Sequence, residues 1–143
     1  MKVKDIMNPK PVTVGKEETV AAAARRLAGQ NLGALPVCGE NGRLCGMVTD
    51  RDLVIRCVAA GRNPEQTRVS EVMTGRVISI HPDTDASVAA HLMGREQVRR
   101  LPVTDNGQLC GILGLSDLAV QEENVMDAAD ALADITRNIS PLL

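Results

Sequence analysis

Apolar and polar positions along the chain form the same succession of predicted elements twice. Apolar runs bounded by Gly, Pro or Asn predict short strands. These lie at residues 11–14, 34–38 and 44–49, and again at 77–80, 100–104 and 109–114. Alanine-rich stretches at 18–29 and 84–95 predict helices, because acidic residues at their starts suit a helix N-terminus. Shorter helical segments are expected at 3–7, 50–60, 69–73 and from 115 onward.

Two tight turns join the strand pairs. The sequences "ENG" at 40–42 and "DNG" at 105–107 each separate two apolar runs. Asn-Gly between strands favours the backbone conformation of a β-hairpin turn. Each strand pair is therefore predicted to be a hairpin.

The succession is an internal repeat. "VKDIMNPKPVTV" from Val3 is matched by "VSEVMTGRVISI" from Val69, and "ALPVCGENGRLCGMVTDRDL" from Ala34 by "RLPVTDNGQLCGILGLSDL" from Arg100. The offset is 66 residues until the hairpin turn and 65 after it, so repeat 2 is one residue shorter there. This predicts repeat 1 at residues 1–60, a polar linker at 61–68, repeat 2 at 69–122 and a helical tail at 123–143.

Each repeat reads β-α-β-β-α, which has too few elements to bury both faces of a sheet alone. The sequence therefore predicts an α+β fold in which two tandem repeats pack with pseudo-twofold symmetry, followed by a C-terminal helix.

Composition narrows the possible functions. The chain has no Phe, Trp or Tyr, and its 16 basic and 18 acidic residues give a net charge of −2. Without aromatic stacking platforms or a basic excess, nucleic acid is not an expected partner. The first residues lack the apolar run of a signal peptide, and no apolar run approaches a membrane span. We therefore expect a cytoplasmic protein with no membrane partner.

Nothing in the sequence indicates catalysis or a metal site. The four Cys and two His show no CxxC or HxxxH spacing, and there is no P-loop or Rossmann glycine pattern. Cys38, Cys45 and Cys110 lie in or beside apolar runs, where a thiol usually behaves as a small hydrophobe. The alternative is thiol sensing through Cys45 and Cys110, which hold equivalent positions in the two repeats. The role of Cys57 stays open.

The repeated motifs resemble a known family. "DIM" at the repeat entrance, "LPV" on the second strand and "G-h-h-T-x-x-D-h" (h, apolar) after the third are similar to a CBS domain pair, or Bateman module. Within that family, "ALPVC" and "GMVTDRDLVI" resemble the stand-alone hypoxic response protein type of actinobacteria. The resemblance implies a regulatory, non-catalytic module that needs no cofactor, binds an adenine nucleotide or S-adenosylmethionine between its repeats, and forms homodimers acting on an unknown protein target.

The stretch "GMVTDRDL" at 46–53 has three interpretations. Thr49 or Asp50 caps a helix, Asp50 and Asp52 hold a hard cation, or Thr49 and Asp52 hold a polar ligand. Arg51 lies between the two carboxylates and argues against the cation. The family resemblance assigns Thr49 and Asp52 to a ribose, and the backbone near Val12 and at Ala34, Leu35 and Pro36 to an adenine edge.

Repeat 2 departs from this pattern. It has Gly114 where repeat 1 has Thr49, although Ser116 and Asp117 remain as a second, weaker site. It also carries Arg99 and Arg100 before "LPV", and their planar guanidinium groups suit phosphate oxygens. The sequence therefore predicts an asymmetric module, in which Arg99 or Arg100 reaches the phosphates of a nucleotide held by Thr49 and Asp52. Solvation of a strand edge is the other interpretation of the two arginines.

The tail has an apolar stripe with helical spacing. Its members are Val125, Ala129, Leu132, Thr136 and Ile139, with Met126, Ala128 and Ile135 beside it. The stripe either packs on its own module or forms a dimer contact. A module that has lost ligand binding and serves only protein interaction or thiol sensing is the alternative function, supported by Gly114.

Overall fold

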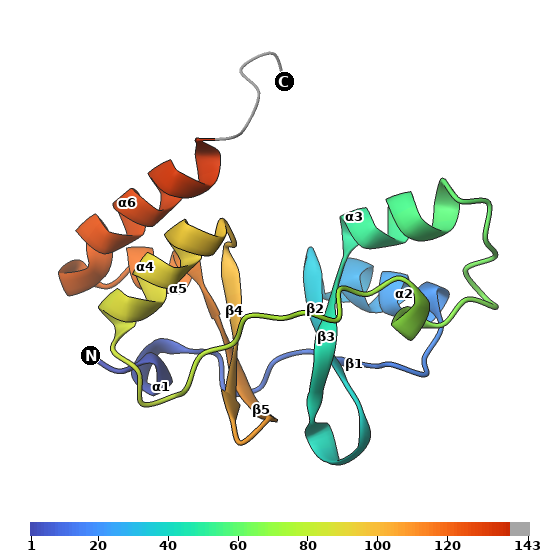
Figure 1. Cartoon of the computed structure of the whole chain (residues 1–143), viewed down its shortest axis with the longest axis horizontal. Coiled ribbons are helices and arrows are strands. Elements are labelled where there is room, and N and C mark those ends of the chain that lie inside the picture. Colours follow the sequence, from blue (N-terminus) through green and yellow to red (C-terminus); the bar gives the residue numbers. More distant parts are fainter. Residues whose placement is uncertain (138–143) are drawn as a thin grey trace. The chain divides into compact units, whose positions relative to one another are not determined.

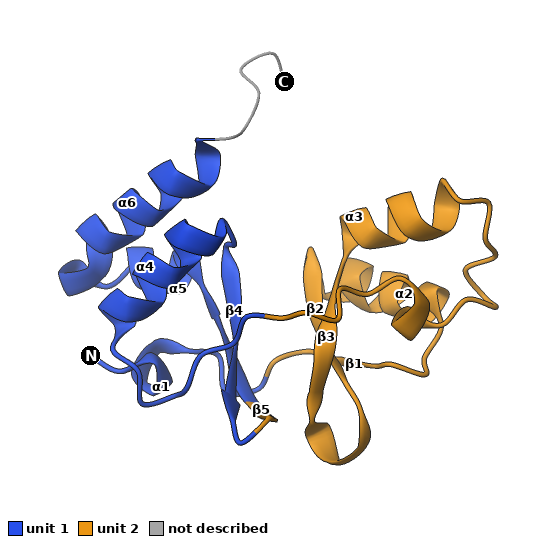
Figure 2. Cartoon of the chain, in the orientation of Figure 1, with its two compact units in different colours: residues 1–10, 78–106, 110–143 blue, residues 11–77, 107–109 orange. Residues whose placement is uncertain are grey.

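The structure, a computed structural model, describes residues 1–137 (Figure 1). The chain forms two compact units that exchange their first segments. Unit 1 contains residues 1–10, 78–106 and the chain from 110 onward, and unit 2 contains residues 11–77 and 107–109 (Figure 2). The start of repeat 1 thus folds with the strands of repeat 2, and the start of repeat 2 folds with those of repeat 1.

Unit 2 is built around a three-stranded sheet of order β1-β2-β3. Strand β2 (Ala34–Cys38) pairs in parallel with the short β1 (Val14–Gly15) and antiparallel with β3 (Leu44–Thr49). Helix α2 (Val20–Gln30) precedes β2, and α3 (Asp50–Leu53) continues into a π-helical turn at Val54–Val58 after β3. The 3-10 turn Val69–Glu71 from repeat 2 completes the unit, and Val69 and Val72 are fully buried in its aliphatic cluster.

Unit 1 repeats this plan with its own aliphatic cluster. It contains α1 (Val3–Ile6), α4 (Ala86–Glu96), α5 (Leu115–Ala119) and the antiparallel pair β4 (Arg100–Asp105) and β5 (Gln108–Gly114), except that the first two residues of β5 are grouped with unit 2. A 3-10 turn (Glu122–Asn124) then leads to α6 (Val125–Thr136). Val3 of the exchanged N-terminal segment is fully buried in this cluster.

Both predicted hairpins are present. The turn residues Asn41 and Gly42 have φ of 59° and 74°, and Asn106 and Gly107 have φ of 51° and 81°. Two successive residues with positive φ match the right-handed twist of the strands they join. The predicted first strand of each repeat is shorter than expected, since only Val14 and Gly15 form β1 and only Ile80 bridges to Val103. The strand predictions over 11–13 and 77–79 were therefore wrong.

Glycines at equivalent positions of β3 and β5 receive the exchanged segments. Met47 and Thr74 exchange two backbone hydrogen bonds of 3.0 and 2.9 Å, and Asn8 and Ile112 do so at 2.9 and 3.0 Å. A Cβ on Gly46 would lie 2.5 Å from the Thr74 carbonyl oxygen, and one on Gly111 would lie 2.6 Å from that of Asn8. The segment can approach the strand this closely only because both residues lack a side chain.

Helix α6 packs on α4 and α5 of its own unit. Its buried face is made of Ala128 and Ala131, with Ile135 half-buried beside them. The predicted stripe is offset from this face, because Val125, Ala129, Leu132 and Thr136 are exposed. Ile139 lies outside the described residues. Small side chains form the contact because α4 and α6 approach closely. If Gly94 of α4 carried a Cβ, that atom would lie 3.3 Å from the Cα of Ala131 in α6.

A salt bridge fixes β1 to α2 in unit 2. Glu18 accepts hydrogen bonds from Arg26 at 2.8 and 2.9 Å and from the Gly15 backbone N–H at 2.7 Å, while Arg26 also donates to the Thr13 carbonyl oxygen at 2.9 Å. The hydrogen bonds from Arg26, and then that from Gly15, lower the pKa of Glu18 to about 2. The ionised carboxylate is therefore favoured in the folded state.

We expect Glu18→Gln to lower the free energy of unfolding at pH 7 by about 1 kcal/mol, a value kept small because the side chain is 39% exposed and screened by solvent. The folded-state pKa is depressed, so this stabilisation is present above pH 4.5 and is lost as the pH falls toward 2. Urea unfolding from pH 7 to pH 2 should show the wild type and the variant converging at acid pH.

Glu65→Gln is the control, because Glu65 forms an ion pair with Arg25 on the exposed side of the same helix. A surface pair of this kind contributes little, so its removal should change stability by less than about 0.5 kcal/mol at every pH. Equal losses of stability in both variants would mean that the hydrogen bonds of Glu18 with Arg26 and Gly15 stabilise the fold no more than an exposed ion pair does.

Candidate functional site

The end of β3 carries a reciprocal helix cap. The Thr49 hydroxyl accepts a hydrogen bond from the Asp52 backbone N–H at 3.0 Å, and the Asp52 carboxylate accepts one from the Thr49 backbone N–H at 2.9 Å. This capping box starts α3 and holds both side chains at the strand's end. Thr49, and not Asp50, is the cap. Asp50 accepts a hydrogen bond from its neighbour Arg51 instead.

The cap leaves hydrogen-bonding capacity unused. The Thr49 oxygen accepts within the cap, so its O–H hydrogen is available to donate to another group. Asp52 uses Oδ2 in the cap, and its Oδ1 lies 3.8 Å from Arg56 Nε, beyond hydrogen-bond distance. One donor and one charged acceptor are therefore fixed side by side, and the Asp52 side chain is only 15% exposed.

The proposed adenine contacts lie at the same end of the sheet. Ala34 is the first residue of β2 and pairs directly with Thr49, the last residue of β3. Strand β1 pairs with β2 only at Val37 and Cys38, so it does not extend along Ala34. Leu35 and Pro36 are buried, and Val12 is half-buried against the unit's core.

The equivalent cap in repeat 2 is only half formed. The Gly114 backbone N–H donates to Asp117 at 2.7 Å, as Thr49 does to Asp52, but Gly114 has no hydroxyl to return the bond. Ser116 lies next to this turn. The fixed donor of repeat 1 thus has no counterpart in this position of repeat 2.

Arg99 and Arg100 lie beside this half-formed cap. With Gly114, Leu115 and Ser116 they line a pocket of about 170 Å³ in unit 1. The Arg99 carbonyl oxygen accepts a hydrogen bond from the Leu115 N–H at 2.8 Å, which fixes the backbone of the arginine next to the helix start. Thr49 and Asp52 belong to unit 2, so the predicted joint contact with one nucleotide stays a prediction.

A pair of cysteines was missed by the sequence analysis. Cys38 and Cys45 line one pocket of unit 2. Cys110, which was considered as the partner of Cys45, belongs to unit 1. The two thiols approach through a β-bulge beside Cys38, which no sequence pattern indicated.

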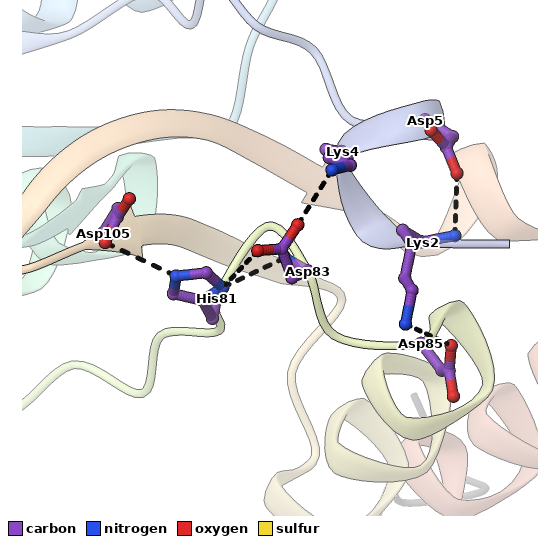
Figure 3. A network of polar contacts seen from close by, with 7 residues as sticks. All are labelled: Lys2, Lys4, Asp5, His81, Asp83, Asp85 and Asp105. Carbon is purple, nitrogen blue, oxygen red and sulfur yellow. Dashed lines mark hydrogen bonds and ion pairs between the residues drawn. The ribbon is translucent and has the colours of Figure 1, made fainter.

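His81 takes part in a network that fixes the exchanged segment in unit 1 (Figure 3). Its Nδ1 accepts a hydrogen bond from the Asp83 N–H at 3.0 Å, and its Nε2 lies 3.4 Å from Asp105. Lys4 and Lys2 of the N-terminal segment pair with Asp83 at 2.9 Å and Asp85 at 3.3 Å. Hydrogen bonding lowers the pKa of Asp83 and raises that of Lys4. The network therefore accounts for His81 structurally.

Among residues 1–137, no group of three or more His, Cys, Asp or Glu side chains is arranged to hold a metal ion. In the same part of the chain, no helix is long and apolar enough to span a bilayer.

Sequence comparison decides the family. The CBS domain model matches residues 3–58 and 69–124. The chain belongs to the CBS domain family. Its two repeats are therefore a CBS pair, as the motifs predicted.

Known proteins resemble this CBS pair over most of its length. The CBS domain-containing protein YhcV of Bacillus subtilis is 42% identical over 134 residues, 94% of each chain. Hypoxic response protein 1 of Mycobacterium tuberculosis is 38% identical over 116 residues, 81% of each chain. A solved structure of Hypoxic Response Protein I with two coordinated zinc ions has a TM-score of 0.79 and 36% identity, covering 85% of this chain and 98% of that one.

A further solved structure contains adenosyl ligands. The CBS domain pair of protein MJ0100, in complex with 5′-methylthioadenosine and S-adenosyl-L-methionine, has a TM-score of 0.72 and 28% identity. The match covers 83% of this chain and 93% of that chain.

Proposed function

We propose that this CBS pair is a non-catalytic regulatory module that binds an adenosyl ligand, with the ribose held by Thr49 and Asp52. The candidate ligands are AMP, ADP, ATP and S-adenosylmethionine. The observation that carries the proposal is the capping box, because it leaves one hydroxyl donor and one carboxylate oxygen fixed at the end of β3. The adenosyl ligands of the MJ0100 pair support the ligand class.

The chemistry of a ribose fits these two groups. Each of its 2′ and 3′ hydroxyls both donates and accepts. A carboxylate oxygen such as Asp52 Oδ1 accepts from a hydroxyl in a charge-assisted hydrogen bond, and the Thr49 O–H donates to a ribose oxygen. Both side chains are already held by the cap, so binding costs little of their rotamer entropy. The backbone at Ala34 is the proposed contact of the adenine edge, and surrounding aliphatic side chains cover its faces.

Arg99 and Arg100 are the proposed phosphate contacts. A guanidinium offers paired N–H donors that match the oxygens of a phosphate. An adenosyl compound without phosphate offers no such oxygens, so the arginines should matter only for nucleotides. The half-formed cap at Gly114 and Asp117 is proposed to bind more weakly, because it lacks the hydroxyl donor.

Calorimetry with AMP, ADP, ATP, S-adenosylmethionine and 5′-methylthioadenosine tests the proposal. At least one of them should bind with a dissociation constant below about 1 mM. If none of the five does, the proposed function is wrong.

The same titrations separate the ribose and phosphate contacts. The double variant Arg99→Gln, Arg100→Gln should weaken nucleotide binding by roughly tenfold or more, because charge-assisted hydrogen bonds are lost. Binding of 5′-methylthioadenosine, which has no phosphate, should change less than twofold. An equal loss for both ligand types would show that the arginines act on the fold and not on phosphate.

A further inference from the structure

Cys38 and Cys45 lie in one pocket of unit 2. The pocket has a volume of about 990 Å³, and Lys16 and Arg43 line it together with both cysteines. Each thiol belongs to a half-buried residue, whereas Cys57 is fully buried in the core. The two side chains are thus both open to a small solute.

A β-bulge places Cys45 across the ladder from Cys38. In the β2–β3 ladder Val37 pairs with Gly46 and Cys38 pairs with Leu44, so Cys45 is an extra residue on β3. In such a bulge two residues of one strand oppose a single residue of the other. Leu44 and Cys45 therefore both oppose Cys38, and the cysteines are cross-strand neighbours.

Gly39 provides the space for the second thiol. A Cβ on Gly39 would lie 2.8 Å from Cys45 Sγ, so the thiol occupies the volume of a side chain next to Cys38. The φ of Gly39 is −95°, so the glycine is required here for space and not for its backbone conformation. The same point lies 3.9 Å from Lys16 Cε, which places a lysine side chain near the Cys45 sulfur.

The two thiols have different surroundings. Burial, and then the charge of a Cys45 thiolate, raise the pKa of Cys38. The Cys38 thiol is therefore harder to ionise than that of a free cysteine. The thiolate is the form of a cysteine that reacts with a peroxide.

We propose that Cys38 and Cys45 are a peroxide-reactive dithiol that closes into a disulfide between β2 and β3. The Cys45 thiolate attacks one oxygen of a hydroperoxide such as hydrogen peroxide. The O–O bond breaks, hydroxide leaves and takes a proton to become water, and Cys45 becomes a sulfenic acid. The Cys38 sulfur then attacks the Cys45 sulfur and the S–O bond breaks. The Cys38 proton leaves with the hydroxide as a second water. Two thiols are oxidised and one peroxide is reduced.

Repeat 2 supplies the natural comparison. Its equivalent of Cys38 is Thr104, and its equivalent of Cys45 is Cys110. The Thr104 hydroxyl donates to Ser79 at 3.1 Å, so a threonine fits this strand position. Cys38→Thr therefore removes one thiol with a residue that the same fold already accepts.

The test uses the full chain treated with hydrogen peroxide in a chelator-containing buffer. Trypsin separates the four cysteines, because cleavage after Arg26, Arg43, Arg51, Arg56, Arg62, Arg100 and Arg137 leaves each on its own peptide. We expect the monomer to lose two of its four thiols and to yield linked peptides 27–43 and 44–51. Cys110→Ser should give the same result.

The variants test the assigned roles. Cys38→Thr should form no disulfide within the chain and should accumulate a Cys45 sulfenic acid that dimedone traps. Cys45→Ser should leave Cys38 unmodified under the same conditions. Four persisting thiols in the wild type, linked peptides joining other cysteines, or a disulfide only between two chains would each overturn the proposal. None of these outcomes depends on adenosyl binding.

Discussion

Gly46→Ala should lower the free energy of unfolding by about 2–3 kcal/mol, the largest stability effect that we expect from any single methyl group in this chain. The added Cβ would lie 2.5 Å from the carbonyl oxygen of Thr74. That oxygen is backbone and accepts a hydrogen bond from Met47, so it cannot move away without breaking the pair of hydrogen bonds that docks the exchanged segment.

Gly111→Ala should have a similar effect in unit 1, because its Cβ would lie 2.6 Å from the Asn8 carbonyl oxygen. Gly29→Ala is the control. Gly29 lies in α2 with no atom within 4 Å of an added Cβ, so the substitution should raise stability by about 0.5–1 kcal/mol. Chemical denaturation measures all three. Losses below about 0.5 kcal/mol at Gly46 and Gly111 would contradict the close docking of the exchanged segments.

The second large effect is on ligand binding. We expect Asp52→Asn to weaken binding of the adenosyl ligand by roughly 10- to 100-fold, because a charge-assisted hydrogen bond to the ribose contributes about 1.5–3 kcal/mol. Thr49→Ala should cost about tenfold through the lost hydroxyl donor. Calorimetry at one ionic strength, with the best ligand of the panel, measures both.

Both substitutions also weaken the helix cap of α3. The control must therefore weaken a helix cap that lies away from the proposed ribose site. Thr19 caps α2 of the same unit, where its hydroxyl accepts from the Ala22 N–H at 3.1 Å. Thr19→Ala should lower stability by about 1 kcal/mol, as Thr49→Ala does, and leave the dissociation constant unchanged. If Thr19→Ala weakened binding as much as Thr49→Ala, the loss would come from the fold and not from a ribose contact.

The local elements of the fold were predictable from the sequence. The hairpins over 34–49 and 100–114 follow from Asn-Gly turns between apolar runs, and α2 and α4 follow from alanine-rich stretches near acidic residues. The exchange of segments was not predictable from such patterns. A short apolar segment such as 3–7 carries no local information on which sheet it will join. Only the two glycines at equivalent positions indicate close docking, and they do not say with which segment.

The C-terminal helix shows a related limit. The apolar pattern indicated a stripe through Val125 and Leu132, with Ala128 beside it, that either packs on its own module or forms a dimer contact. The structure buries Ala128 and Ala131 instead, because a short distance between α4 and α6 admits only small side chains. The spacing of large apolar residues therefore predicted the helix but not the face by which it packs on its own unit, and the dimer contact stays a prediction.

The candidate site was also predictable only in part. The pairing of Thr49 with Asp52 was predictable because residues three apart at a helix start face each other, and the capping box confirms that they do. The proximity of Cys38 and Cys45 was not, because it depends on a bulge that shifts the register of one strand by one residue.

An NMR titration of the isotope-labelled full chain with the best adenosyl ligand tests the central claim most directly. The amide resonances of Thr49 and Asp52 report on the cap itself, and those of Gly114 and Asp117 report on its counterpart in repeat 2. We expect the resonances of Thr49 and Asp52 to shift at low ligand concentration, with a midpoint that matches the calorimetric dissociation constant. The resonances of Gly114 and Asp117 should shift weakly or only at higher concentration. Shifts that appear first at Gly114 and Asp117, with Thr49 and Asp52 unchanged, would contradict the assignment of the ribose site to repeat 1.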